Sequence, residues 1–239
     1  MEFISNNKED ISTLATIIHD LKNPIIGCEK AIYLLEKERF GELNDTQHEI
    51  LKMCFRSLSF SKYLINNILS SYKNSQQHIS LYLQELDLAE LTKECIEELS
   101  VFSQERNIQI NLSTTINKFV FADKNEIKRV ILNLIFNAIS NSPQNENIEI
   151  ITTNNKETVS FIVTNIGNYI PQEQLKTIFN KNISIKNRYN KASTGLGLYL
   201  SKEIILAHGG EIIAKSYKNN KNIFGFKLKL HKALETIKN

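Results

Sequence analysis

The sequence predicts an α+β protein of two parts, an all-helical hairpin followed by a layer of helices on a mostly antiparallel sheet. Up to about residue 72, apolar residues recur at intervals of three and four, which is the period of amphipathic helices. Beyond residue 78 the period switches between two and about 3.6. A polar stretch over residues 73–78 separates the two patterns. With 239 residues in all, each part is long enough to bury a core of its own.

The first part is predicted to hold two helices, over residues 8–38 and 45–72, with a loop through Gly41 between them. Asn44 or Asp45 is the expected N-cap of the second helix. The first helix carries a heptad seam of apolar side chains: Ile11, Leu14, Ile18, Leu21, Ile25, Cys28, Ile32 and Leu35. One hairpin cannot cover two apolar stripes. We therefore expect it to pair with a second copy into a four-helix bundle.

The second part is predicted to alternate strands and helices. Strands are expected over residues 80–86, 108–112, 119–122, 148–153, 159–164, 211–217 and 224–230. Helices are expected over residues 88–104, 124–141 and 196–207, with a short one after Pro171. A polar, lysine-rich loop is expected over residues 180–194.

Composition excludes several classes of protein. Hydrophobic residues at 41% and charged residues at 23% are typical of a globular protein. A net charge of +3, with Lys and Arg spread along the chain, gives no indication of nucleic-acid binding. No apolar run is long enough to span a membrane, and the first residues do not form a signal peptide. The three cysteines match neither a metal site nor a disulfide framework, which favours a cytoplasmic location.

A histidine on the outer face of the first helix is the first candidate for chemistry. His19, Asp20 and Asn23 fall on the b, c and f positions of the heptad, away from the seam. The imidazole can exchange a proton near neutral pH, and the adjacent carboxylate could hold its tautomer. Pro24 lacks an N–H group for Asp20, so a bend beside the histidine is expected. Alone, however, a surface histidine is more readily explained without any function.

Three asparagines lie four residues apart on the helix over residues 124–141, namely Asn133, Asn137 and Asn141. Asparagine is a poor helix former, so a stack of three calls for a reason. Amide oxygens are suitable ligands for a Mg²⁺ ion that bridges phosphates. Since this chain contains many asparagines, simple solvated positions are an equally good explanation.

Two glycine-containing segments are candidates for ligand contact. Thr194-Gly195-Leu196-Gly197-Leu198 leads into a helix, where bare backbone and free N–H groups could bind phosphate. Basic residues in the preceding loop could close on a polyphosphate: Lys181, Lys186, Arg188 and Lys191. Asn165-Ile166-Gly167 ends a strand and could form the wall of a pocket. Taken alone, the second segment is more often just a turn, and the first is weak evidence that lacks the strand and spacing of a Rossmann or P-loop motif.

The order and separation of these four elements resemble the transmitter core of sensor histidine kinases, over roughly residues 10–230. His19-Asp20-Leu21-Lys22-Asn23-Pro24 looks like the H box of that family. The segment over residues 132–138 looks like its N box, Asn165-Ile166-Gly167 stands at its G1 box, and residues 194–198 match its G2 box.

This resemblance implies a dimerisation and phosphotransfer hairpin over residues 1–76, an α/β sandwich of the Bergerat ATP-binding fold over residues 77–232, and a tail over residues 233–239. It implies that ATP and Mg²⁺ are used, with the ion held by Asn137 together with Asn133. Nucleotide contacts are implied for Asn165, Gly167, Lys186, Arg188, Thr194, Gly195, Leu196, Gly197 and Leu198.

The implied reaction is attack of His19 on the γ-phosphorus of ATP, with Asp20 bonded to the other ring nitrogen. The phosphoryl group then passes to an aspartate in the receiver domain of a response regulator. Asn23 matches the position that orients water for removal of phosphate from the regulator. The resemblance further implies a homodimer that takes its signal from a sensory domain upstream or from a partner, so the chain could be the cytoplasmic part of a longer sensor.

The chain departs from the family pattern at the G1 box, where Asn165 replaces an aspartate that binds the adenine amino group and Tyr169 replaces a glycine. Asn165 keeps an acceptor oxygen but loses the charge, which should weaken that bond by about 1 kcal/mol. Ser140 and Asn141 stand where a basic and an aromatic residue are common. The intact N and G2 boxes favour the kinase, and the altered G1 box alone favours an alternative function, a dimeric adaptor that docks a response regulator without using ATP.

Overall fold

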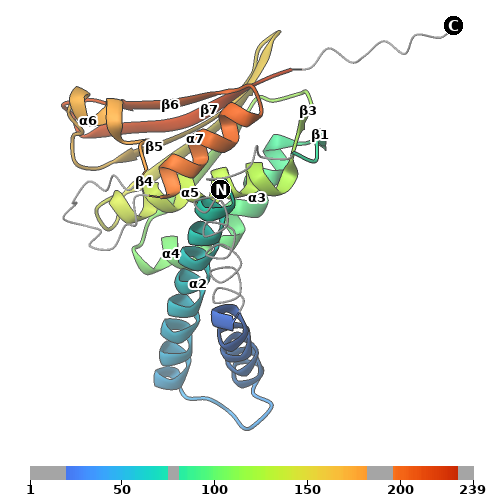
Figure 1. The fold of residues 1–239 in the computed structure, drawn as a ribbon. Helices are drawn as coiled ribbons and strands as arrows, with labels where there is room; N and C mark the ends of the chain where they lie inside the picture. Colours follow the sequence, from blue (N-terminus) through green and yellow to red (C-terminus); the bar gives the residue numbers. More distant parts are fainter. Residues whose placement is uncertain (1–19, 75–80, 182–195, 231–239) are drawn as a thin grey trace, which may run out of the picture. The chain divides into compact units, whose positions relative to one another are not determined.

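The computed structural model describes residues 20–74, 81–181 and 196–230. The chain divides into two compact units, Met1–Gln77 and His78–Asn239. Figure 1 shows their elements, and each unit is described by itself. Among the described residues, no helix is both long and apolar enough to cross a membrane.

The first unit is a helical hairpin. Its described part consists of a helix over residues 20–36, which continues through Pro24, and of α2 (Asp45–Asn74). The first helix ends two residues earlier than predicted, and Glu38 adopts a φ of 52° in the connection. Asn44 caps α2 through a reciprocal pair of hydrogen bonds: the Gln47 N–H donates to Asn44 Oδ1 and the Asn44 N–H donates to Gln47 Oε1, both at 2.9 Å.

The predicted seam of the first helix is largely uncovered in a single copy of the chain. Ile32 is buried, whereas Leu21, Cys28 and Leu35 are exposed. On α2, Ile50 and Cys54 are exposed as well, although the sequence places both in an apolar stripe. One hairpin therefore leaves its apolar faces open to solvent. The dimeric four-helix bundle stays a prediction.

The second unit contains a two-stranded and a five-stranded sheet. The two-stranded sheet pairs β1 (Gln84–Leu86) with β3 (Val120–Ala122). The larger sheet has the order β2-β4-β5-β7-β6, in which β2 and β4 are parallel and the other neighbours antiparallel. Its strands are β2 (Gln109–Thr114), β4 (Asn147–Asn154), β5 (Thr158–Ile166), β6 (Glu211–Ser216) and β7 (Lys221–Lys229). The predicted, mostly antiparallel sheet is confirmed.

Helices cover one face of the larger sheet (Figure 1). They are α3 (Leu88–Glu98), α4 (Ser100–Glu105), α5 (Lys124–Asn141), α6 (Gln172–Thr177) and α7 (Gly197–Ala207). Strand residues alternate, so that Val159, Phe161 and Val163 face the helices and are buried. The α+β prediction is thus confirmed for this unit. The predicted helix over residues 88–104 is instead two helices, because the chain leaves α-helical geometry at Leu99.

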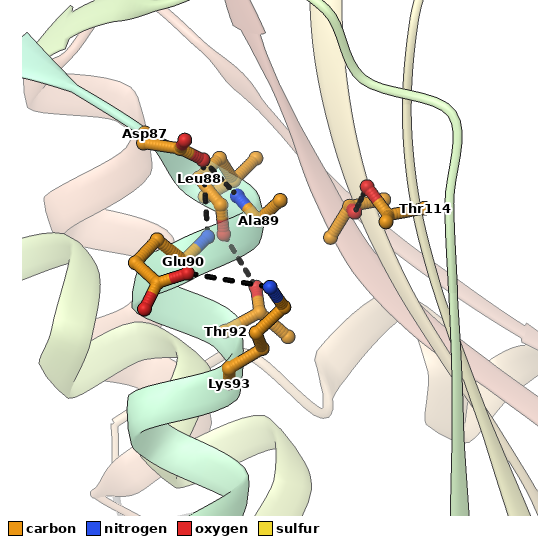
Figure 2. Close-up of polar contacts among 8 residues, drawn as sticks. Asp87, Leu88, Ala89, Glu90, Thr92, Lys93 and Thr114 are labelled. Atoms are coloured by element: carbon orange, nitrogen blue, oxygen red, sulfur yellow. Dashed lines mark hydrogen bonds and ion pairs between the residues drawn. The ribbon is translucent and has the colours of Figure 1, made fainter.

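Aspartate side chains fix the starts of two helices. Asp87 Oδ1 accepts hydrogen bonds from the N–H groups of Ala89 and Glu90 at 2.9 and 3.0 Å, which caps α3 (Figure 2). One turn later, the buried Thr92 hydroxyl donates to the carbonyl of Leu88. These local bonds satisfy polar groups that the helix start would otherwise leave unpaired.

Asp123 does more than cap α5. Its Oδ1 accepts from the N–H groups of Asn125 and Glu126, and its Oδ2 accepts from the N–H of Tyr82 at 2.9 Å. The Asp123 N–H in turn donates to Nε2 of His208 at 3.0 Å. The half-buried His208 ring lies just after α7, where its Nδ1 bonds the carbonyl of Ile204. Asp123 therefore joins α5, the chain before β1 and the end of α7.

Replacing Asp123 should cost more stability than replacing Asp87, because three N–H groups lose their acceptor rather than two. We expect Asp87→Ala to lower the free energy of unfolding by about 1 kcal/mol and Asp123→Ala by about 2–3 kcal/mol. Urea denaturation of the full chain, followed by circular dichroism, measures both. Equal losses in the two variants would contradict a joining role for Asp123.

Candidate functional site

A buried polar network lies where the end of α5 meets the end of β5. The Ser142 hydroxyl donates to the carbonyl of Ala138 and accepts from Asn165 Nδ2 at 3.2 Å. Asn165 Nδ2 also donates to the carbonyl of Ile166 at 3.1 Å. Both amide hydrogens of Asn165 are thus engaged, and in the described part of the chain its Oδ1 has no hydrogen-bond donor. This 3% exposed side chain therefore presents an acceptor at the position implied to read the adenine amino group.

Gly167 allows the backbones of α5 and the chain after β5 to approach closely. A Cβ at this position would lie 2.7 Å from the carbonyl oxygen of Asn141 and 3.1 Å from the amide nitrogens of both Asn165 and Asn222. Any other residue would push the end of β5 away from α5. The Gly167 N–H also bonds the carbonyl of Asn220 at 2.8 Å.

Asn222 faces the same network from β7, because the strand register places it opposite Asn165. Its Nδ2 donates to the carbonyl of Asn168 at 3.1 Å, whereas its Oδ1 is buried and has no partner among the described residues. Of the buried side-chain polar atoms in the described ranges, Arg106 Nε is the other one without a partner, although Arg106 Nη2 bonds the carbonyl of Ser142. Unpaired buried polar atoms are uncommon in folded proteins, and their presence here indicates a place where polar groups meet a ligand or water.

Two turns back along α5, Asn133 faces α7 and is 2% exposed. Its Nδ2 donates to the Ser201 hydroxyl at 2.8 Å, and its Oδ1 lies against the backbone of Gly197. The side chain is thus committed to the contact between α5 and α7.

Asn137 lies one helical turn from Asn133 and one turn from Asn141, and it is half-buried. Its carbonyl accepts from Asn141 Nδ2 at 2.7 Å, while its own side-chain amide has no hydrogen bond within the described residues. An available amide oxygen between the two ends of the site fits the chemistry of a Mg²⁺ ligand. Clusters of three or more His, Cys, Asp or Glu that could hold a metal are absent from the part of the chain that the structure describes.

The phosphate-binding candidates are only partly described. Leu196 occupies the N-cap of α7, and its side chain has no acceptor to satisfy the first N–H groups of the helix. Leu196, Gly197 and Leu198 are half-buried there. Lys186, Arg188, Thr194 and Gly195 lie outside the described residues. Tyr169 is exposed, and Tyr199, in the first turn of α7, has a raised pKa because of partial burial and the nearby Glu203 carboxylate.

In the helical unit, His19 lies outside the described residues. Asp20 and Asn23 follow it on the described helix, three positions apart, and both are exposed. In the other unit, burial raises the pKa of the Cys95 thiol to about 12 and keeps it protonated, so this thiol is not a nucleophile.

Comparison with known proteins identifies relatives of this chain. Residues 122–232 match the family described as "Histidine kinase-, DNA gyrase B-, and HSP90-like ATPase". The chain is 27% identical over 222 residues to the adaptive-response sensory kinase SasA of Synechococcus sp. (strain JA-3-3Ab), covering 92% of this chain and 59% of that protein. The solved catalytic domain of histidine kinase ThkA is 31% identical, with a TM-score of 0.56, covering 62% of this chain and 95% of that domain.

The chain belongs to the sensor histidine kinases. A structure of ThkA in complex with the response regulator protein TrrA shares the fold, with a TM-score of 0.60 at 24% identity over 96% of this chain and 66% of that one. This histidine kinase chain spans about three-fifths of the length of the relatives that it matches.

Three residues of the candidate site were not anticipated from the sequence. Ser142 directly follows the predicted helix, and Ser201 follows Gly197 by one helical turn, so helical spacing could have indicated both. Asn222 carries no such signal, because its place beside Asn165 depends on the pairing of β5 with β7. The predicted strand over residues 224–230 also began too late to include it.

The Ser142 hydroxyl should contribute more to the free energy of unfolding than the hydroxyl of another buried serine. We expect Ser142→Ala to lower the free energy of unfolding by about 2 kcal/mol, because Asn165 keeps a buried N–H without a partner. Ser103→Ala is the matched control, since the Ser103 hydroxyl makes one bond, to the carbonyl of Ser100, and should cost at most about 1 kcal/mol. Thermal or urea unfolding of the full chain measures the difference. Similar values for the two serines would show that the bond to Asn165 contributes nothing.

Proposed function

We propose that this kinase chain phosphorylates itself on His19 with ATP and passes the phosphoryl group to an aspartate of a response regulator. The observation that carries the proposal is the asparagine ladder of α5, formed by Asn133, Asn137 and Asn141. This part of the helix contacts a different glycine at each end. The backbone carbonyl of Asn141 lies against Gly167 at one end, and the side chain of Asn133 lies against Gly197 at the other. At 1.5 Å per residue, the two ends lie about 12 Å apart along the helix.

The adenine base binds at the end near Gly167. Both hydrogens of Asn165 Nδ2 are held by protein acceptors, so Oδ1 faces the base as a hydrogen-bond acceptor. The amino group of adenine is a matching donor. In this way a neutral amide takes the place of the aspartate that is usual in the family.

The triphosphate extends along α5 toward α7. The first N–H groups of α7 and the positive end of its dipole stabilise phosphate charge. Lys186, Arg188, Thr194 and Gly195 contribute from the segment before α7. Asn137, whose side-chain amide makes no hydrogen bond within the described residues, would hold the magnesium ion, which would neutralise phosphate charge.

In the reaction, one imidazole nitrogen of His19 forms a bond to the γ-phosphorus as the bond from that phosphorus to the ADP oxygen breaks. Asp20 accepts a hydrogen bond from the other ring nitrogen and holds the tautomer that leaves the attacking nitrogen unprotonated. Asn23 orients water for removal of phosphate from the regulator. Positioning and charge neutralisation supply most of such catalysis.

The partners follow from the same assignment. The exposed seam residues Leu21, Cys28 and Leu35 support burial against a second copy in a four-helix bundle over residues 1–76. The complex of ThkA with TrrA supports a receiver domain as the phosphoryl acceptor. Use of ATP supports a cytoplasmic location, with the signal supplied by a sensory domain or a partner.

Autophosphorylation is tested with purified full chain, Mg²⁺ and γ-labelled ATP. We expect acid-labile, base-stable label on the wild type and at least about a hundredfold less on His19→Gln, which lacks the nucleophile. Asn137→Asp should lose label to a similar extent, because a carboxylate in place of the amide changes how the magnesium ion is held. His48→Gln is the matched control and should label normally.

Folded wild type that takes no label, and binds no ATP analogue at millimolar concentration with Mg²⁺, would contradict the kinase. Such a result would favour the adaptor that docks a regulator without ATP.

Asn165→Asp should move nucleotide affinity and stability in opposite directions. A carboxylate accepts a stronger hydrogen bond from the adenine amino group, so ATP should bind about fivefold more tightly. The free energy of unfolding should fall by about 1–2 kcal/mol, because the donor to Ser142 is lost and an oxygen faces the carbonyl of Ile166. Titration calorimetry and urea denaturation measure the two effects.

Asn155→Asp is the matched control for charge, since Asn155 lies in the turn before the other end of β5. It should leave ATP affinity unchanged. Weaker ATP binding by Asn165→Asp would rule out base recognition through Oδ1.

A further inference from the structure

Gly197 is in an unusually tight contact with Asn133. A Cβ added to Gly197 would lie 2.2 Å from Asn133 Oδ1, 3.0 Å from its Cγ and 3.2 Å from its Nδ2. All three atoms lie beyond the Cβ of Asn133. An alanine at residue 197 therefore clashes with the asparagine side chain, and the clash disappears when residue 133 is cut back to alanine.

The Asn133 side chain cannot turn away from this contact without loss. Its Nδ2 donates to the Ser201 hydroxyl at 2.8 Å, and both side chains are 2% exposed. Gly197 and Ser201 are separated by one turn of α7, so they lie on the same side of that helix. Asn133 is thus held between the backbone at the start of α7 and a hydroxyl one turn further on.

The backbone of Gly197 does not itself require glycine. In the described ranges the glycines with positive φ are Gly41 and Gly209, and Gly197 opens an α-helix with ordinary dihedrals. Conformational freedom is therefore not the reason for glycine here. Glycine is needed because the Asn133 side chain occupies the space that a Cβ would take.

We infer that Asn133 is a positioning residue, which locks the first turn of α7 onto α5 through Gly197 and Ser201 and so sets the direction of the N–H groups that receive phosphate. This inference rests on the proposed function. It gives Asn133 a different task from Asn137, which lies one turn away and ligates the ion. It also makes Gly197 the steric partner of Asn133 rather than a flexible joint.

The test is a double-mutant cycle in the full chain, with Gly197→Ala, Asn133→Ala and the double variant. Gly197→Ala should lower the melting temperature by at least about 3 °C, because an overpacked contact must open. In the Asn133→Ala background the same change should lower it by less than about 1 °C. An equal drop in both backgrounds would overturn the inference.

Ligand binding distinguishes positioning from a general loss of structure. Gly197→Ala should weaken binding of Mg-ATP by at least about tenfold and leave binding of adenosine within about twofold, since the base end is untouched. Ser201→Ala should weaken Mg-ATP by about threefold, with adenosine again unchanged. Equal losses for ATP and adenosine would overturn positioning of the phosphate end.

Gly167→Ala is the matched control for the contact. Its added Cβ meets the backbone carbonyl of Asn141, so Asn133→Ala should not rescue it. Rescue of both glycine variants by Asn133→Ala would show a nonspecific effect. It would overturn the inference that Asn133 locks the first turn of α7 onto α5. If the wild type bound no ATP, the proposed function would fail, and the melting cycle on the unliganded protein would still decide the contact between Asn133 and Gly197.

Discussion

The arrangement of the second unit depends on how closely α5 can approach its neighbours. Glycine backbone lies against both ends of its asparagine ladder, with Gly167 at the carbonyl of Asn141 and Gly197 at the side chain of Asn133. A single methyl group at either position would force the elements apart. These contacts fix β5 on one side and α7 on the other. The half-buried Asn137 therefore lies between two fixed elements. A ligand site needs such precision, since small displacements weaken every bond that it makes.

Capping gives the same unit its second set of constraints. Asp123 accepts bonds at the start of α5 and from the chain before β1, while its N–H reaches the imidazole that follows α7. The end of α7 is thus tied to the start of α5, and the start of α7 is tied to the middle of α5 by Asn133. Two anchors at opposite ends fix the direction of α7, which is the helix whose N-terminus faces the proposed phosphate site.

The base end of the site is built from neutral amides. Asn165 and Asn222 lie opposite each other on paired strands, where Asn165 donates two hydrogen bonds and Asn222 one to protein oxygens. What they leave to a ligand is acceptor oxygen, which is also what a carboxylate offers. The replacement of the usual aspartate therefore preserves the pattern of hydrogen bonding and lowers its strength. Under the proposed function, this replacement lowers nucleotide affinity and leaves the fold intact.

The sequence by itself determined the α+β class, most element boundaries and the N-cap of α2, because hydrophobic period and capping chemistry are local. It also singled out Asn137 and the glycine segments, since these stand in short motifs. The tertiary structure alone decided that Asn133 belongs to the contact with α7, that Asn222 joins Asn165, and that Asp123 meets His208. Asn165 and Asn222 are 57 residues apart in the chain, Asn133 and Ser201 are 68 apart, and Asp123 and His208 are 85 apart. Such distant partners meet only when strand register and helix packing are set, and no local pattern encodes either.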